Sequence, residues 1–185
     1  MPRITLINTP ADYPGEPDAA TQADLATLFA TLFPGAAAPA FDAAHTGLAI
    51  AAHNPQLALK LAQLSGFIAS ELPWSQHRAL RELAIQTVNQ YIGSAYSFAA
   101  RRPSALACGV SDDQLRALVA WRASSLFDAD ERLVIEYAET TVAGTVSDDL
   151  SARMVARFGE KGTVECTALV AFWGFWAMLL GATYG

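Results

Sequence analysis

Signals that start helices recur along this chain, and they constrain its fold more strongly than any other feature of the sequence. Ser111 with Gln114, and Asp128 with Glu131, each have the spacing of a capping box, in which two side chains bind free N–H groups at a helix start. Apolar residues repeat at helical spacing behind these starts, and no segment alternates with the period of a β-strand over a useful length. The sequence therefore predicts an all-α fold with about eight helices.

The beginning of the chain is predicted to be an extension of the main helical domain. Residues 1–18 contain four prolines, which cannot sustain a helix, and Thr21 with Asp24 then forms a further capping-box pattern. A chain of 185 residues has the length of one compact domain with such an extension. We therefore predict an N-terminal arm and helix over residues 1–40 and a helical domain over residues 41–185.

The chain carries little charge for its size. Charged residues make up 16% of the sequence and hydrophobic residues 52%, whereas roughly 25% charged residues is usual for a soluble domain. Stable monomers rarely expose large apolar patches, so we expect part of the apolar surface to be buried between the subunits of a homo-oligomer. The net charge is −6 and the basic residues are scattered, so we expect no nucleic acid partner.

The C-terminal stretch 167–185 has nineteen residues without a charge, which is near the length that spans a lipid bilayer. The stretch has no basic flank and contains glycine, threonine and tyrosine. A helix packed in a core or a subunit interface is therefore the favoured interpretation, and a membrane span is the alternative. The N-terminus lacks the apolar core and cleavage site of a signal peptide, so we expect a cytoplasmic protein with no membrane partner.

A long helix, predicted to run from Ser75 past Gly93 toward Arg102, carries a polar face. At roughly 100° per residue, the side chains on this face fall between about −40° and +100° of the first of them. They are Glu82, Gln86, Asn89, Tyr96, Ser97 and Arg101. One interpretation is the solvated side of an amphipathic helix. Solvated faces are usually rich in Lys and Glu, whereas this one is mostly uncharged, which favours the wall of a semi-buried pocket.

Three segments around this helix form a recognisable pattern: Arg81-Glu82-Leu83-Ala84-Ile85, Ser94-Ala95-Tyr96-Ser97-Phe98-Ala99-Ala100-Arg101 and Ala107-Cys108-Gly109-Val110-Ser111-Asp112-Asp113-Gln114. The pattern resembles the alkylhydroperoxidase D-like and carboxymuconolactone decarboxylase family. In its peroxidase members, a Glu is followed by Cys, Cys and His at the spacing that here leads from Glu82 to Ser94, Ser97 and Arg101. The resemblance covers residues 41–180 and implies the family's helical bundle, assembled as a dimer, trimer or hexamer. The segment Ala171–Trp176 departs from the more polar pattern of the family.

Serine stands at both positions where those peroxidases have cysteine. Peroxide reduction needs a thiolate and a second thiol, because a sulfenic acid must condense with another sulfur, and a serine hydroxyl has no comparable redox chemistry. Cys108 and Cys166 lack the C-x-x-C and metal-ligand spacings, so we expect both to be buried and reduced. No trio of His, Cys and carboxylate residues has metal-site spacing, and we expect neither a metal nor a cofactor.

The remaining polar side chains suit acid–base chemistry on a small anionic organic molecule. Desolvation in an apolar bundle disfavours the charged form of a carboxyl group, which would let Glu82 carry a proton. Arg101 would bind a substrate carboxylate through a two-pronged hydrogen bond. The predicted catalytic hydroxyl groups are those of Ser94, Tyr96 and Ser97, and the further substrate contacts are Gln86, Asn89 and His53. The resemblance implies a lyase that decarboxylates or isomerises a small organic carboxylate or lactone without a cofactor.

Two other functions stay open on the sequence alone. The chain could be a non-catalytic family member that serves as a binding or oligomeric protein. It could also be an alkylhydroperoxidase-type antioxidant oxidoreductase that uses another thiol. The role of His53 is open as well, since it could be a second acid–base group in the pocket or a structural histidine held by a hydrogen bond.

Overall fold

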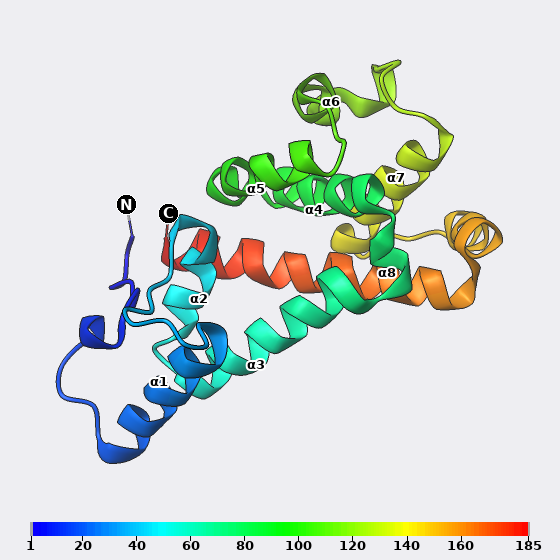
Figure 1. Ribbon diagram of the computed structural model, residues 1–185. Helices are drawn as coiled ribbons and strands as arrows, with labels where there is room; N and C mark the ends of the chain where they lie inside the picture. Colours follow the sequence, from blue (N-terminus) through cyan, green and yellow to red (C-terminus); the bar gives the residue numbers. More distant parts are fainter. Residues whose placement is uncertain (1, 185) are drawn as a thin grey trace. The chain divides into compact units, whose positions relative to one another are not determined.

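A computed structural model describes residues 2–184, and the predicted all-α fold is confirmed: this part of the chain contains helices and no strands (Figure 1). The eight α-helices of residues 2–184 are α1 (Ala19–Leu32), α2 (Thr46–Ala51), α3 (Pro55–Gly66), α4 (Arg78–Ile92), α5 (Ala95–Ala107), α6 (Asp112–Ala117), α7 (Ala129–Ala143) and α8 (Asp148–Thr183). Shorter helical turns lie between them, at Pro10–Asp12, Ala43–His45, Phe67–Glu71, Pro73–Gln76 and Leu118–Ala123.

The helices form two compact units. The first extends to Gly66 and includes the end of α8 from Leu179, and the second comprises Phe67–Met178. These units are defined by contacts within the folded chain. They do not test the domain division expected between residues 40 and 41, which stays a prediction. The candidate residues on α4 and α5 all belong to the second unit.

The capping boxes define helix starts as predicted. The Ser111 hydroxyl accepts a hydrogen bond from the Gln114 N–H at 3.1 Å, while the Gln114 side chain accepts one from the Ser111 N–H at 2.9 Å. Asp128 and Glu131 make the same reciprocal pair at the start of α7. These contacts satisfy N–H groups that have no partner inside the helix.

The cap predicted at Thr21 is wrong. Asp18 caps α1 instead, and its carboxylate accepts a hydrogen bond from the Thr21 N–H at 2.7 Å. Asp is as good a cap as Thr or better, and Asp18 lies one turn earlier, so the helix begins at Ala19. The same interaction lowers the pKa of Asp18, because the hydrogen bond from the Thr21 N–H stabilises the ionised carboxylate.

The single long helix predicted from Ser75 to Arg102 is also wrong. The observed helix, α4, starts at Arg78 and ends at Ile92. The next residue, Gly93, adopts a left-handed conformation with φ 77° and ψ 23°. The N–H of Ser94 then bonds to the Asn89 carbonyl at 2.9 Å, which closes the helix with a Schellman motif, and α5 begins in a new direction at Ala95. The side-chain angles predicted for an unbroken helix therefore hold on α4 but not on α5.

Pro103 lies inside α5, although proline usually kinks or ends a helix. A proline in a helix leaves the carbonyl group four residues earlier without its usual donor. Here that residue is Ala99, which is exposed, so solvent can take the place of the missing donor.

The second unit buries α4 at its centre. Every residue from Glu82 to Asn89 is buried, and α4 packs against both α5 and α7 (Figure 1). One hydrophobic cluster joins α4, α5, α6 and α7, and its members are Leu83, Ala105, Val110, Leu115, Leu118, Trp121, Phe127 and Ile135. The interpretation of the polar face as a solvated surface is therefore wrong for its α4 part.

The last helix bends at Gly159, where φ is 73° and ψ is 168°. This helix, α8, is long and apolar enough to cross a membrane when length and composition alone are considered, and 33% of its most apolar window is buried. Core helices of soluble proteins pass the same test, so the finding does not distinguish the two interpretations of the C-terminal stretch.

Candidate functional site

A buried carboxylate bound by two arginines forms the centre of the candidate site. Glu82, near the start of α4, is completely buried. Its two oxygens accept hydrogen bonds from Nε and Nη2 of Arg101, both at 2.9 Å. Its Oε1 also accepts from Nε and Nη2 of Arg81, at 3.1 and 2.9 Å. One carboxylate and two guanidinium groups leave one positive charge, which suits the binding of an anion.

Arg81 was not among the predicted site residues, and it is the more firmly fixed of the two arginines. Its Nη1 donates to the carbonyl oxygens of Ala69 and Ser75, at 2.7 and 3.3 Å. Its side chain is 14% exposed. Adjacent residues on a helix point about 100° apart, so helical spacing does not predict that Arg81 contacts Glu82. The arginine side chain is long enough for its guanidinium group to reach the Glu82 carboxylate.

Arg101 is the more accessible arginine. It comes from the middle of α5, and its side chain is 29% exposed. The guanidinium carbon lies 5.3 Å from the centre of the Trp173 ring, in the geometry of a cation–π contact. Trp173 lies on α8 and is buried, so the Arg101 guanidinium contacts both this ring and the Glu82 carboxylate. The predicted anion anchor is thus bound to the predicted proton carrier.

Gln86 and Asn89 continue the polar face of α4 beneath Glu82, as the helical spacing predicts. Gln86 donates from Nε2 to the Phe98 carbonyl oxygen at 3.1 Å, which joins α4 to α5. Asn89 donates from Nδ2 to Gln86 Oε1 at 3.0 Å. Its own Oδ1 is buried and finds no donor among residues 2–184, an arrangement that usually costs about 1–3 kcal/mol. A ligand hydroxyl could supply that donor.

The side chains of Ser94 and Ser97 touch each other. The hydroxyl oxygens of Ser94 and Ser97 are 2.7 Å apart, and both residues are buried. Ser97 and Arg101 are four residues apart on α5, so they share one face of this helix. Tyr96 lies in the first turn of α5 and is half-buried. The structure thus brings together the two serines, whereas Tyr96 points from α5 in another direction.

Cys108 differs from the prediction that both cysteines are buried. It is half-buried, and its Sγ lies 3.3 Å from Nη2 of Arg81 and 3.6 Å from Nη2 of Arg78. Arg81 therefore bridges the Cys108 thiol and the Glu82 carboxylate. Cys166 is buried as predicted, and desolvation raises the pKa of its thiol far above the ordinary range.

His53 belongs to the first compact unit, where its Nε2 lies 2.9 Å from the Thr5 carbonyl oxygen. This contact gives His53 the hydrogen bond expected of a structural histidine, and its role in substrate binding stays a prediction. Within residues 2–184, no three His, Cys, Asp or Glu side chains are grouped closely enough to share a metal ion.

No protein-family model matches the sequence, and no solved structure is similar to it. The chain is similar to an uncharacterized protein of Escherichia coli (strain K12), YnjA, with 44% identity over 62 residues. This similarity covers 32% of the present chain and 34% of YnjA, so the chain matches about a third of that relative's length.

Proposed function

We propose that Glu82 and Arg101 form the acid–base and anion-binding site of a carboxymuconolactone decarboxylase-like protein, which acts without a cofactor on a small organic carboxylate or lactone. The observation that carries the proposal is the buried, two-pronged ion pair between these residues. A guanidinium group that fits the carboxylate of Glu82 in this way fits a substrate carboxylate equally well.

The two arginines have different roles in this proposal. Arg101 exchanges its bond to Glu82 for one to the substrate, because it is the more exposed of the two arginines and also contacts the Trp173 ring. Arg81 stays bound to Glu82 and to two backbone carbonyl groups. The buried carboxylate therefore keeps one positive partner when the substrate arrives, which avoids the large cost of an unpaired buried charge.

The exchange gives Glu82 its chemical role. An oxygen atom released from Arg101 becomes free to accept a proton from a carbon next to the substrate carboxylate and to return it at another carbon. Ser97, on the same face of α5 as Arg101, donates a hydrogen bond to the oxygen on which negative charge develops. This sequence moves a proton within the substrate and requires no external oxidant or reductant.

Binding is tested by thermal shift with γ-butyrolactone-γ-carboxylate and levulinate, two carboxylates without an aromatic ring that carry hydrogen on the carbon next to the carboxylate. We expect one of these carboxylates to stabilise the wild-type protein and to lose that effect in Arg101→Ala and Arg101→Lys. Lysine keeps the positive charge but cannot make the two-pronged hydrogen bond of arginine. Arg102→Ala is the matched control, because Arg102 is exposed and pairs with Asp112. Stabilisation that survives both Arg101 substitutions contradicts the proposed site.

Catalysis is tested separately by NMR, which follows deuterium entering the carbon next to the carboxylate of a bound compound. The wild-type protein should catalyse this exchange, and Glu82→Gln should lose it by about a hundredfold or more, the usual contribution of a general base. Binding without exchange in the wild-type protein supports the alternative of a non-catalytic binding protein.

Cys108 gives a second candidate function, a hydroperoxide reductase that uses one protein thiol. The observation in its favour is the pair of guanidinium groups on its Sγ, since nearby cations favour a reactive thiolate. The thiolate would take one oxygen from the peroxide and release an alcohol. One thiol of dithiothreitol would then condense with the sulfenic acid with loss of water, and its second thiol would release the Cys108 thiolate and leave oxidised dithiothreitol. Peroxide turnover with dithiothreitol that disappears in Cys108→Ser would favour this function over the acid–base one, for which we expect no turnover.

A further inference from the structure

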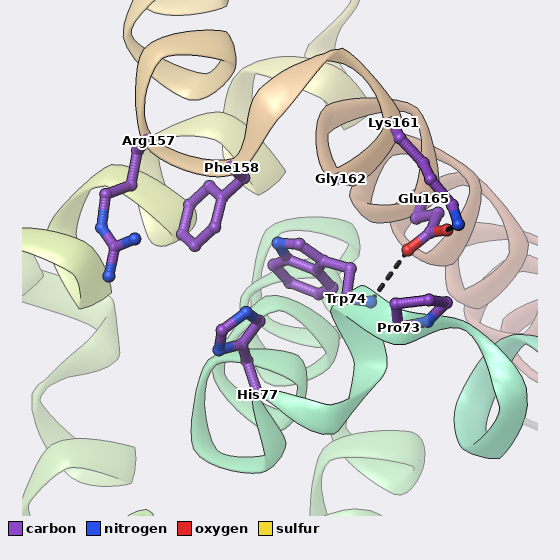
Figure 2. Close-up of a pocket in the computed structure, with 8 residues that line it drawn as sticks. All are labelled: Pro73, Trp74, His77, Arg157, Phe158, Lys161, Gly162 and Glu165. Carbon is purple, nitrogen blue, oxygen red and sulfur yellow. Dashed lines mark hydrogen bonds and ion pairs between the residues drawn. The ribbon is translucent and has the colours of Figure 1, made fainter.

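A pocket lies in the same compact unit as the Glu82 cluster and shares no residue with it. It has a volume of about 300 Å³, at the lower end of the range for pockets that bind small organic molecules. It lies at the bend of α8, where Gly159 separates the two straight parts of the helix. Its lining residues are Pro73, Trp74, His77, Arg157, Phe158, Lys161, Gly162 and Glu165 (Figure 2).

Aromatic rings form one side of this pocket, which we name the Trp74 pocket. The rings of Trp74 and Phe158 meet edge to face with their centres 5.9 Å apart. His77 lies 5.7 Å from Phe158 and 6.3 Å from Trp74, also edge to face. Gly162 faces the indole closely, since a Cβ atom there would lie 3.4 Å from Trp74 Cδ1 and 3.0 Å from Phe158 Cβ. Such a wall suits a flat ring.

The indole N–H of Trp74 is a hydrogen-bond donor without an acceptor among residues 2–184. Trp74 is 3% exposed, and buried indole N–H groups usually find a partner. Figure 2 shows this nitrogen on the edge of the ring that faces Phe158. The backbone N–H of the same residue is satisfied, because it donates to Glu165 Oε2 at 2.8 Å. The unsatisfied side-chain donor points to a ligand with an acceptor atom.

The charges around the pocket favour an anionic ligand. Arg157 and Lys161 are positive, and Glu165 is negative. Glu165 is occupied by the Trp74 backbone, and the Lys161 ammonium lies 3.8 Å from its Oε1 while remaining 79% exposed. Arg157 donates to both oxygens of Asp130, which leaves Lys161 as the more exposed cation at the rim. A cationic ligand would meet the Lys161 ammonium there, and the one acid of the lining, Glu165, already has partners.

We propose that the Trp74 pocket binds a small aromatic carboxylate. The ring of the ligand packs against Phe158 and His77. One of its carboxylate oxygens accepts a hydrogen bond from Trp74 Nε1, and the Lys161 ammonium pairs with the carboxylate. This site is separate from the proposed Glu82 site, and binding here does not depend on the function proposed there.

The test is a titration of ¹⁵N-labelled full-length protein with benzoate, followed by NMR. The protein has four tryptophans, so four indole N–H signals are expected, and Trp74→Phe identifies the signal of Trp74 by its loss. Benzoate should move this signal progressively, toward the downfield position of a hydrogen-bonded N–H. Benzyltrimethylammonium, which has the ring but the opposite charge, should move it little.

Two lysine variants make the test specific without touching the core. Lys161→Glu reverses an exposed charge at the rim and should weaken benzoate binding about fivefold, the effect of roughly 1 kcal/mol from one exposed charge pair. Lys60→Glu makes the same change in the first unit and should leave binding unchanged. The inference is overturned if the Trp74 signal does not move with benzoate, if it moves equally with the cation, or if Lys161→Glu binds as tightly as Lys60→Glu. Arg101→Ala should abolish only binding at the Glu82 site and leave the Trp74 shift intact, so the two proposals can fail separately.

Discussion

The carboxylate of Glu82 accepts four hydrogen bonds from two arginines inside the bundle. Replacing this residue by leucine leaves both guanidinium groups without their buried partner. Breaking a buried ion pair on one side usually costs about 3–5 kcal/mol, and we expect a loss of this size in the free energy of unfolding of Glu82→Leu. Urea unfolding measures it. Asp113→Asn, which removes an exposed pair with Arg116, should cost about 1 kcal/mol or less. Equal losses for both variants would contradict the ion-paired arrangement.

The two cysteines should react very differently with thiol reagents. Cys108 is half-buried beside two cations, whereas Cys166 is buried and its thiol pKa is raised by desolvation. Thiolates are the reactive form, so iodoacetamide at pH 8 should modify Cys108 and leave Cys166 unmodified until the protein unfolds. Mass spectrometry of the digested protein gives the site of labelling. Modification of Cys166 in the folded protein would show that its environment is more open than the structure indicates.

The contact between Ser94 and Ser97 at the junction of α4 and α5 can be tested directly with cysteine substitutions. The two hydroxyl oxygens are 2.7 Å apart, so sulfur atoms at these positions can approach to bonding distance. We expect Ser94→Cys/Ser97→Cys to form a disulfide in air, with a loss of two hydrogen atoms in the intact mass. The single variant Ser94→Cys is the control and should keep its thiol. A double variant that retains both thiols under oxidising conditions would contradict the observed local geometry.

The ion pair between Asp130 on α7 and Arg157 on α8 should make the contact between these helices sensitive to acid. Hydrogen bonding from Arg157 holds the pKa of Asp130 below its ordinary value of 3.8. Since the folded-state pKa is the lower one, the pair stabilises the fold above pH 3.8, and this contribution is lost as the pH falls through the folded-state value. Asp130→Asn should therefore be less stable than the wild type at pH 7, and the difference should shrink below pH 3.

Urea unfolding at both pH values checks the Asp130 prediction, with Arg157→Gln and the double variant completing a cycle. The double variant should be no less stable than either single variant, because each substitution removes the same interaction. A difference between wild type and Asp130→Asn that persists unchanged in acid would assign the effect to something other than the charge.

Helix starts were predictable because capping depends on residues only three apart in the chain, as at Ser111 and Asp128. The shared face of Glu82, Gln86 and Asn89 followed from one period of one helix. The same reasoning failed beyond Gly93, because a glycine in the left-handed conformation ended the helix and changed the direction of every later side chain.

Contacts between elements could not be predicted in the same way. The sequence suggested Arg101 as an anchor and Glu82 as a proton carrier, but not that the two bind each other across α4 and α5. Trp173 is far from both in the chain, and its contact with Arg101 depends on how α8 packs in the second unit. Arg81 was missed because its reach depends on the side-chain rotamer, which spacing does not encode.

At the scale of the whole molecule, the expected homo-oligomer needs an apolar surface, and α8 offers one. Apolar side chains that are exposed or half-exposed repeat every three or four residues along its second part: Val164, Ala168, Ala171, Phe175 and Met178. This is the spacing by which two helices pack along a common seam. The low proportion of charged residues, 16%, also agrees with burial of part of the apolar surface between subunits.

We expect light scattering to find a mass of two or more subunits for the wild-type protein and a smaller mass for Ala171→Arg, since a guanidinium group in the middle of the seam would lose its hydration on association. Ala152→Arg is the matched control, because Ala152 is an exposed alanine on α8 before the bend at Gly159. A wild-type monomer contradicts the oligomer. A wild-type protein that sediments with membranes, and is released by Ala171→Arg but not by Ala152→Arg, would instead assign the same surface to lipid, because the arginine opposes burial in either environment.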